Sequence, residues 1–421
     1  MVPPQMVYYG TMPAREPSPE TNHTFEEGST LPIKIMHTAD VHIDTIRYGR
    51  DNPRTGLNYV VESNLSCLAF LVQVAIEREV DLFLLAGDLF TDANPQIEHL
   101  LRLEDVLQPL VNEGIPIAID EGNHEYLYIK SQKWRSPASA LAGLLGGKKD
   151  VHLSNSLDLT HYGAFDLLSI PYPDKATILA DEGQTRIDPI LGDGVVVRRV
   201  LRDMHTELEN RDESVPLIIT GHLTVDGIGL PGSERDVANH MNECVFPVSS
   251  FEDLNPAYVG LGHIHTPQKV GEKTYYSGSP NKLTFTDYKD EKRGNLVTIH
   301  DDGSHEVESV FTPTRGLYIV DLEQEEFTLD LKENDVVKVL LKPGEVTLDP
   351  DIKKQFKDAH ASPIVKRRPV PRPQRERVVM PQTISPEAAL KQHLKNGGYS
   401  EDEITTLVAK AKTLGVGGTT K

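Results

Sequence analysis

Residues that bind divalent metal ions occur in five short clusters along this chain, and each cluster follows a short apolar run. The clusters contain only carboxylate, amide and imidazole side chains: Asp40 with His42, Asp88, Asn123 with His124, His222, and His263 with His265. Mixed oxygen and nitrogen ligands without thiolate suit Mn²⁺, Fe or Zn²⁺ better than Ca²⁺. Two ions about 3.5 to 4 Å apart need a shared carboxylate to offset their repulsion, and they can activate an attacking water. The clusters therefore indicate a two-metal centre that hydrolyses phosphoesters.

The apolar runs predict the strands that carry these clusters. They are rich in Ile, Leu and Val and cover residues 33–36, 82–86, 115–119, 217–219 and 258–261. Between the first two runs, five apolar residues recur at helical spacing: Leu65, Leu68, Ala69, Val72 and Ile76. Strand and helix therefore alternate, as in an open α/β sheet. Such sheets bind ligands beyond the carboxyl ends of their strands, where the clusters lie.

Each cluster alone is a weak signal. A GH or GD dipeptide occurs by chance, and a lone buried histidine is more often a satisfied core residue than a metal ligand. A glycine directly precedes four of the clusters, at Gly87, Gly122, Gly221 and Gly262. Glycine lets the chain turn sharply and brings the backbone close to a bound metal. Five such clusters in one order form a far more specific pattern than any one of them.

The motifs read TADVH, GDLF, GNHE, GH and GHIH, and their order resembles that of the calcineurin-like metallophosphoesterase superfamily. The resemblance implies an α/β fold, the metallophosphoesterase sandwich. It assigns one metal ion to Asp40, His42, Asp88 and His265, and the other to Asp88, Asn123, His222 and His263. Asp88 is then the bridging ligand. His124 matches the family's catalytic histidine, which stabilises the transition state or protonates the leaving oxygen. A purely structural role for His124 is the alternative.

The text between the motifs resembles the SbcD-type DNA repair nucleases, the bacterial and viral counterparts of the eukaryotic meiotic-recombination nuclease. The matching segments are IPYP at 170–173, GHLTVDGIGLPGSER at 221–235, YVGLGHIHTPQ at 258–268 and YYSGSPNKLTF at 275–285. Two residues depart from the usual pattern: Glu125 stands where Asp is frequent, and Asp44 stands where Gly is common. His37 and Asp44 flank the first motif, and we expect them to support the ligands or to lie at the surface.

This narrower resemblance implies a divalent-metal-dependent DNA exonuclease and endonuclease, with Mn²⁺ as the expected metal. It also implies a homodimer that works with an SMC-like, coiled-coil ATPase of the SbcC type on double-stranded ends and single strands of DNA. Such a protein is cytoplasmic and nucleoid-associated, or acts in a host cell if a virus encodes it. The resemblance extends over about residues 33 to 311, and beyond them it covers only the layout of the chain.

Composition agrees with an intracellular enzyme of two or three domains. The chain has 421 residues and only two cysteines, Cys67 and Cys244, which excludes a disulfide framework and favours a reducing compartment. The first 31 residues lack the apolar core of a secretory signal, and we expect them to be flexible. We find no stretch of the roughly 20 apolar residues that a membrane span needs.

The formal net charge of −20 argues against a simple DNA-binding surface, because affinity for nucleic-acid phosphates usually comes from many Lys and Arg contacts. The metal ions could supply local positive charge, and a partner subunit could hold most of the DNA. Two other functions stay open. One is a calcineurin-like phosphodiesterase or phosphatase that acts on nucleotides or phosphoproteins, and the other is a catalytically silent scaffold subunit.

The sequence predicts five segments. They are a flexible extension (1–31), the nuclease domain (32–311), a small α/β capping domain (312–361), a basic Pro-rich linker (362–384) and a helix-loop-helix partner-docking segment (385–416). Prolines exclude a long helix in the linker. Its basic residues either belong to a solvated linker or contact DNA, and the candidate DNA contacts are Lys366, Arg367, Arg368 and Arg372.

The last segment reads as two short helices. The first begins at Pro386 after Ser385, and the second begins with a capping box formed by Ser400 and Glu403. An apolar stripe on the second helix contains the candidate docking residues Ile404, Leu407 and Val408. Two helices this short cannot bury such a stripe alone. We therefore expect the stripe to pack on the chain's own core or on the coiled coil of a partner.

Overall fold

The computed structural model describes residues 32–125, 128–129, 132–133, 136–146, 151–183, 189–229, 244–367, 386–396 and 399–413. The chain divides into two units, residues 1–367 and 368–421. The expected N-terminal extension, residues 1–31, lies outside the described residues, as do Arg368 and Arg372 of the predicted linker.

Two six-stranded sheets form the body of the first unit. The first sheet has the order β16-β15-β1-β2-β3-β6. Its strands are β1 (Ile33–Thr38), β2 (Leu82–Leu85), β3 (Ile117–Asp120), β6 (Val151–Ser154), β15 (Arg293–Ile299) and β16 (His305–Phe311). The first four run parallel to one another. Strand β15 pairs antiparallel with β1, and β16 pairs antiparallel with β15.

The second sheet has the order β13-β14-β12-β9-β8-β7. Its strands are β7 (Asp158–His161), β8 (Asp166–Ile170), β9 (Leu217–His222), β12 (Tyr258–Gly262), β13 (Gln268–Lys269) and β14 (Thr274–Tyr276). The four central strands are parallel, and the edge strands β7 and β13 are antiparallel to their neighbours. All five apolar runs of the sequence analysis therefore form strands of these two sheets, which confirms the predicted α/β class.

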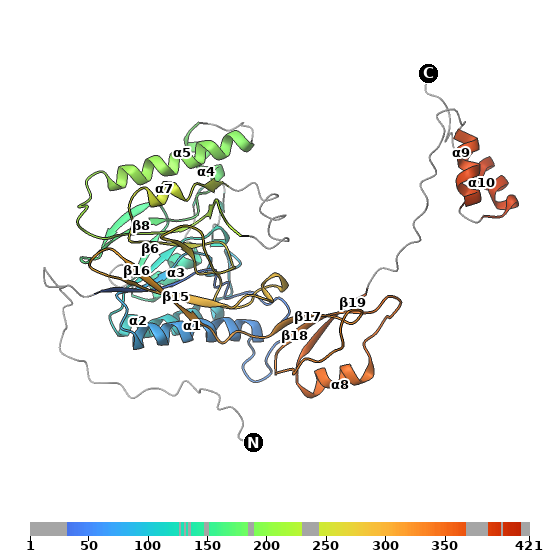
Figure 1. Cartoon of the computed structure of the whole chain (residues 1–421), viewed down its shortest axis with the longest axis horizontal. Coiled ribbons are helices and arrows are strands. Elements are labelled where there is room, and N and C mark those ends of the chain that lie inside the picture. Colours follow the sequence, from blue (N-terminus) through green and yellow to red (C-terminus); the bar gives the residue numbers. More distant parts are fainter. Residues whose placement is uncertain are drawn as a thin grey trace. The chain divides into compact units, whose positions relative to one another are not determined.

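The two sheets pack face to face, with helices on their outer faces, and successive side chains along a strand point alternately to these two layers. In β2, Leu82 and Leu84 point into the layer between the sheets, while Phe83 and Leu85 pack under the helices of the first sheet. Those helices are α1 (Tyr59–Glu77), α2 (Ile97–Asn112) and α3 (Pro137–Leu144). The second sheet is covered by α4 (Lys175–Asp181), α5 (Pro189–Leu208) and α7 (Ser249–Glu252). Figure 1 shows α1 and α2 below the sheets and α4 and α5 above them.

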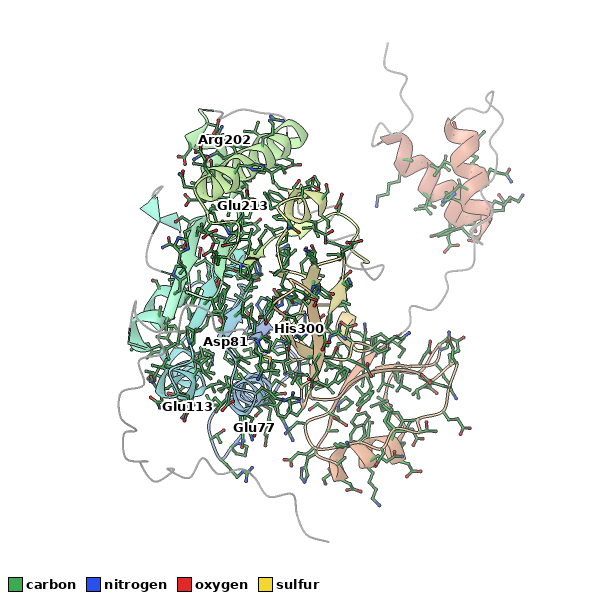
Figure 2. All side chains as sticks on the ribbon, turned by 60° about the vertical axis from the view of Figure 1, so that its left-hand side comes forward. Glu77, Asp81, Glu113, Arg202, Glu213 and His300 are labelled. Carbon is green, nitrogen blue, oxygen red and sulfur yellow. The ribbon has the colours of Figure 1, made fainter. Side chains whose placement is uncertain are left out.

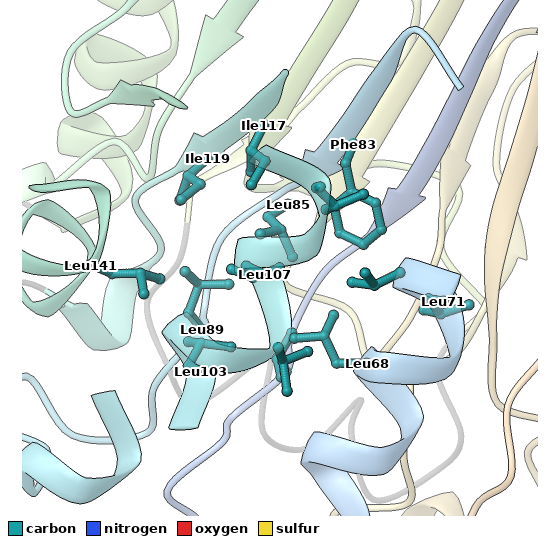
Figure 3. Packing of buried hydrophobic residues seen from close by; sticks show 14 of the residues in the cluster. Leu68, Leu71, Phe83, Leu85, Leu89, Leu103, Leu107, Ile117, Ile119 and Leu141 are labelled. Carbon is teal, nitrogen blue, oxygen red and sulfur yellow. The ribbon is translucent and has the colours of Figure 1, made fainter. Parts of the chain in front are cut away.

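The two helical layers lie at opposite sides of the sandwich. Figure 2 places Arg202 of α5 on one side and Glu77 and Glu113, at the ends of α1 and α2, on the other. Close packing joins the first helical layer to its sheet, as Figure 3 shows for Leu68 of α1 and Leu107 of α2. Short connecting elements complete the body: η1 (Asn123–Glu125), β4 (Tyr128–Ile129), β5 (Gln132–Lys133), β10 (Thr224–Val225), β11 (Val245–Phe246) and η2 (Phe285–Asp287).

Helix α1 is long and apolar enough to cross a membrane, contrary to the expectation that no segment of the chain would be. The helix buries nine residues, among them Leu68 and Leu71, against the first sheet. Its apolar composition is therefore accounted for by its place in the core.

The capping domain follows β16. It is a parallel sheet of β17 (Leu317–Asp321), β18 (Val336–Leu340) and β19 (Ser362–Lys366), with helix α8 (Pro350–Asp358) packed on it. Strand β19 occupies residues that the sequence analysis assigned to the linker, so the capping domain extends to Lys366 rather than ending at residue 361. Pro363 is compatible with this strand because β19 is an edge strand, where a missing N–H can go unpaired.

The second unit contains two helices, α9 (Pro386–Asn396) and α10 (Glu401–Thr413), which lie where the sequence predicted them and pack against each other. The predicted capping box is present. The Ser400 N–H donates to Glu403 Oε2 at 2.9 Å, and the Glu403 N–H donates to Ser400 Oγ at 3.4 Å.

Candidate metal centre

The five ligand clusters meet where parallel strands of both sheets end. Asp40, Asp88 and Asn123 follow β1, β2 and β3, which are neighbours in the first sheet. His222 ends β9 and His263 directly follows β12, and these two strands pair in the second sheet. The face-to-face packing of the sheets therefore brings together ligands that are up to about 220 residues apart in the sequence.

The backbone is strained at the ligands themselves. Asp40, His42, Asp88 and His263 all have positive φ, at 53°, 45°, 53° and 93°. Non-glycine residues rarely adopt this conformation, and it persists at functional sites because the surrounding structure enforces it. Three of the preceding glycines are needed for space. A Cβ at Gly87 would lie 2.2 Å from His222 Nδ1, one at Gly122 would lie 2.1 Å from Asp88 Oδ1, and one at Gly262 would lie 1.9 Å from the Ala86 carbonyl oxygen.

The first group of ligands gathers around His42. Its Nε2 atom is 3.2 Å from His265 Nε2 and 3.5 Å from Asp88 Oδ2. Asp40, His42 and His265 each offer a ligand atom within 4.8 Å of the others. The Asp40 carboxylate is held by the His263 N–H, which donates to both of its oxygens at 3.0 Å.

The second group gathers around His222. Its Nδ1–H donates to the Ala86 carbonyl at 2.8 Å, which leaves Nε2 facing inward. That Nε2 atom lies 3.1 Å from Asn123 Oδ1 and 3.4 Å from Asp88 Oδ2. His263 Nδ1 is 3.1 Å from the same Asn123 oxygen. Acceptor atoms thus converge on one point, which fits a cation better than a hydrogen-bond network.

These two groups correspond to the two ligand sets that the family resemblance implies, with Asp88 in contact with both. Asp40, Asp88 and His222 form a further set of ligand atoms within 4.8 Å of one another, so Asp40 also lies near the second group. The donor types and their convergence fit two divalent ions.

The candidate ligands differ in protonation while no metal is bound. Burial lowers the pKa of His42 and of His265 to about 4, so both rings are neutral near pH 7 and can offer lone pairs. Burial also opposes a charge on His222, but the adjacent Asp88 carboxylate outweighs it and raises the pKa of His222 to about 10, so a metal ion would displace a proton from this ring. Burial alone would raise the pKa of Asp88, and the surrounding histidines instead hold it below its usual range. The Asp88 carboxylate therefore remains charged and attracts a cation, whereas burial raises the pKa of Asp40.

His124 lies beside the centre with an accessible side chain, 40 % exposed. Its Nε2 atom is 3.9 Å from Asp88 Oδ2. Its Nδ1–H donates to the Thr91 carbonyl at 2.9 Å, and its backbone N–H donates to Asp88 Oδ1 at 3.1 Å. Because Nδ1 is engaged, Nε2 is the atom that can give a proton to a substrate or take one from it.

Asp44, which the sequence analysis left as a supporting or surface residue, holds the loop beneath His124. Its carboxylate accepts the N–H of Thr91 at 2.5 Å and the N–H of Asp92 at 3.1 Å. The Thr91 hydroxyl is 3.3 Å from His42 Nδ1, so the same loop touches a ligand and the catalytic candidate. The position was visible in the sequence only as a departure from glycine.

Glu125, the other departure, has a related role. Its buried carboxylate accepts the N–H groups of Leu89 and Phe90, which follow Asp88, and of Gly122. Burial, together with the nearby Asp88 charge, raises the pKa of Glu125 to about 8. Glu125 therefore joins the loops after β2 and β3. The sequence did not predict these hydrogen bonds.

His37 and Tyr172 occupy different surroundings. His37 is fully buried between the sheets, where its Nδ1 is 2.9 Å from the Tyr258 hydroxyl, and burial lowers its pKa to about 3. Tyr172 of the IPYP segment lies at the edge of the centre, with its ring centroid 6.1 Å from that of His263 and 6.4 Å from that of His222. The sequence assigned Tyr172 no role.

The remaining predicted residues belong to the end of the first unit and to the second unit. Lys366 ends β19, and Arg367 follows it with an exposed side chain. In α10, Ile404 and Val408 are 5 % exposed, whereas Leu407 is 39 % exposed. The helical pair therefore covers two of the three candidate docking residues itself.

A model of the calcineurin-like phosphoesterase family matches residues 33–267, more than half of the chain. The chain belongs to this family, and it is a metal-dependent phosphoesterase by its fold and its ligand set.

Several solved structures are similar at low sequence identity. The phosphopantetheinyl hydrolase of Mycobacterium tuberculosis is 11 % identical, with 60 % of this chain and 92 % of that chain covered and a TM-score of 0.33. A dimetal phosphatase of Danio rerio is 12 % identical, with 66 % and 99 % covered and a TM-score of 0.35. A purple acid phosphatase of yellow lupin (Lupinus luteus) is 13 % identical, with 68 % and 54 % covered and a TM-score of 0.37.

Proposed function

We propose that the chain is a DNA nuclease subunit that hydrolyses DNA phosphodiesters as an exonuclease and an endonuclease. The observation that carries the proposal is the attachment of the capping domain to the loop that follows His42. Arg50 Nη2 donates to the His360 carbonyl at 2.9 Å, and Arg315 Nη2 donates to the Arg47 carbonyl at 3.4 Å. A second domain fixed close to a phosphoesterase centre suits a long polymer, which must be held and presented, more than a small ester.

The chain's own residues supply a consistent mechanism. The seven ligands from Asp40 to His265 would hold two divalent ions, Mn²⁺ in this proposal. When bound, such ions lower the pKa of a water and neutralise charge on the phosphate oxygens. His124 Nε2 faces the same space and delivers a proton to the leaving oxygen, or stabilises its charge. The Thr91 carbonyl fixes the orientation of the ring while this happens.

The proposal includes a partner. The helical pair would bind an SMC-like, coiled-coil ATPase of the SbcC type, and the exposed Leu407 is the anchor that remains available on α10. The nuclease would work as a homodimer on double-stranded ends and single strands, in the cytoplasm and near the nucleoid. Lys366 and Arg367 would add DNA contacts at the edge of the capping domain.

A phosphodiesterase or phosphatase that acts on nucleotides or phosphoproteins is the second candidate. The net charge of −20 favours it, because an acidic surface repels a polyanion. The third candidate, a catalytically silent scaffold, is disfavoured by the intact ligand set.

One assay separates the candidates. Purified protein with Mn²⁺ is incubated with duplex DNA, a cyclic nucleotide and a phosphopeptide, and Asp88→Asn serves as the control for contaminating enzymes. We expect cleavage of the duplex that Asp88→Asn lacks. Turnover of the nucleotide or the phosphopeptide with intact duplex would replace the nuclease by the second candidate, and inactivity of a metal-loaded protein on all three substrates would favour the scaffold.

A further inference from the structure

A cavity of about 300 Å³ lies between the loop that precedes α1 and the first residues of the capping domain. Three arginines line it: Arg50 and Arg54 from the loop, and Arg315 from the segment that enters β17. We call this cavity the arginine pocket. It is separate from the metal centre, none of whose ligands lines it.

The arginines of this pocket lack the carboxylate partners that several other arginines have. Five arginines elsewhere pair with carboxylates: Arg78, Arg102, Arg199, Arg202 and Arg211. Within the described part of the chain, neither Arg50, Arg54 nor Arg315 forms an ion pair. The chain has 63 acidic and 43 basic residues, so acidic side chains outnumber basic ones. Three unpaired guanidinium groups around one cavity therefore indicate a site for an anion from outside the chain.

Arg315 is the most enclosed of the three. Its Nε–H donates to the Lys282 carbonyl at 3.2 Å and its Nη2 donates to the Arg47 carbonyl at 3.4 Å, so its hydrogen bonds go to neutral groups. Burial lowers the pKa of Arg315 to about 10. Asp287 acts on it only from beyond ion-pair distance, and its carboxylate is 3.8 Å from Lys292. A partly buried cation without a counter-ion is costly, and an anionic ligand would remove that cost.

Other features of the pocket agree with a phosphate group. The first turn of the 19-residue helix α1 lines it through Tyr59, and a helix N-terminus attracts anions. The Arg50 guanidinium lies 5.3 Å from the centre of the Tyr59 ring. Glu62 and Glu333 also line the pocket and oppose an anion. The Glu62 carboxylate already accepts hydrogen bonds from Asn52 Nδ2 at 3.0 Å, and three arginines outnumber the two acids.

We propose that the arginine pocket binds a phosphate group, supplied either by a nucleic-acid backbone or by free phosphate or a nucleotide. With the backbone as the source, the inference deepens and rests on the proposed nuclease function, because it names a second point at which the substrate is held. A planar guanidinium binds phosphate oxygens through paired hydrogen bonds, which suits three arginines on one cavity.

A hydrogen-bonded path joins this pocket to the metal centre. Arg315 contacts the carbonyl of Lys282, whose N–H donates to Asn281 Oδ1 at 2.9 Å. Asn281 Nδ2 donates to Asn64 Oδ1 at 2.6 Å, and Asn64 Nδ2 donates to the His42 carbonyl at 2.9 Å. A phosphate held by Arg315 is therefore fixed relative to a metal ligand, which would set the register of a bound strand.

The test uses the full chain and two variants with exposed target side chains, Arg50→Gln/Arg54→Gln and Arg54→Gln alone; the single variant keeps the Arg50 hydrogen bond to the His360 carbonyl and so leaves this attachment of the capping domain in place. The matched control is Arg198→Gln/Arg202→Gln on α5, which removes the same charge far along the chain. Inorganic phosphate is titrated against metal-free protein by calorimetry, and duplex DNA binding is measured in EDTA over a range of salt. Hydrolysis of bis(p-nitrophenyl) phosphate with Mn²⁺ verifies that the metal centre of each variant is intact.

If a nucleic-acid backbone is the source, the double pocket variant lowers the slope of log K against log[salt] by about 1.8, since each lost contact contributes about 0.9. If free phosphate is the source, wild-type protein binds phosphate saturably and the pocket variant does not. The proposal is overturned if phosphate and DNA binding both equal those of the α5 control. Arg54→Gln alone replaces the double variant if that variant does not fold. Arginine-dependent phosphate binding without DNA cleavage would refute the nuclease and leave the pocket standing.

Discussion

Removing the Asp44 carboxylate should impair catalysis through His124 while leaving the metal ligands in place. Asp44 accepts the N–H groups of Thr91 and Asp92, and the Thr91 carbonyl in turn accepts His124 Nδ1–H. In Asp44→Ala both amides lose an ionised acceptor. A hydrogen bond to a charged group contributes about 1.5–3 kcal/mol, but Asp44 is half-buried and water can replace it in part, so we expect the lower end of that range.

The catalytic effect follows from the loosened position of the imidazole. A general acid contributes about 10² to 10⁴ in rate, and a ring that is held only part of the time loses a share of this. We therefore expect Asp44→Ala to lower turnover about 10- to 100-fold on a phosphodiester with an alkyl leaving group. A p-nitrophenyl ester, whose leaving group needs no proton, should slow by less than about threefold. Asp44→Asn keeps one acceptor oxygen, so its turnover of the alkyl ester should lie between that of the wild type and that of Asp44→Ala.

A double-mutant cycle decides whether Asp44 acts through His124. In a His124→Ala background there is no imidazole to orient, so adding Asp44→Ala should change turnover of the alkyl ester by little. Elemental analysis should find unchanged metal in all three variants. Equal slowing of both esters, or a full additional loss in the His124→Ala background, would refute the positioning role and leave Asp44 a general structural residue.

Three further predictions follow from the site and the helices. Asp88→Ala should lose metal, measured by elemental analysis, along with activity, because Asp88 lies in both ligand groups; His124→Ala should keep metal while turnover falls by about 10² or more. Burial raises the pKa of Asp120 to about 7. The stability that the protonated carboxyl contributes is therefore present below the pKa of Asp120 in the unfolded chain and is lost as pH rises through 7. Asp120→Asn in EDTA should flatten the fall in Tm between about pH 5 and 8. Leu407→Glu should weaken the complex with a coiled-coil ATPase by several kcal/mol, seen as loss of co-purification, without changing small-ester hydrolysis. Undiminished binding would move the docking site elsewhere.

The strands and the positions of the candidate ligands could be predicted because each depends on a short piece of sequence. An apolar run that ends in a metal-binding residue identifies both the strand and the position of its ligand, as β2 and Asp88 illustrate. Parallel strands then collect these ends at one edge whatever the length of the connections. The general location of the metal centre therefore follows from local patterns and one rule of topology.

The supporting residues could not be predicted, because their partners are distant in the sequence. Arg315 contacts the carbonyl of Arg47 across 268 positions, and Asp44 meets Thr91 across 47. In each of these contacts the side chain meets a backbone group, which carries no sequence signature. Only the departures from family pattern at Asp44 and Glu125 marked these positions, and a departure does not reveal what the new side chain touches.

Two errors of detail have simple physical causes. Proline excludes a helix but permits an edge strand, so Pro363 lies in β19 although the segment was predicted to be a linker. On α10, Ile404 and Val408 are four residues apart and share the covered face, while Leu407 falls toward solvent. The apolar stripe was real, but the partner helix α9 covers part of it.

The net charge of −20 does not describe the field that a phosphodiester meets at this protein. Salt screens charges beyond about 8–10 Å, so only the groups near the substrate matter. At the metal centre the two acidic ligands, Asp40 and Asp88, would be offset by two divalent ions with four positive charges. At the arginine pocket three guanidinium groups have no ion-pair partner in the described chain, whereas Arg102 of α2 and Arg199 of α5 pair with neighbouring acids. If both proposals hold, an acidic chain would repel polyanions over most of its surface and still bind a phosphate at two places, which would confine binding to one orientation.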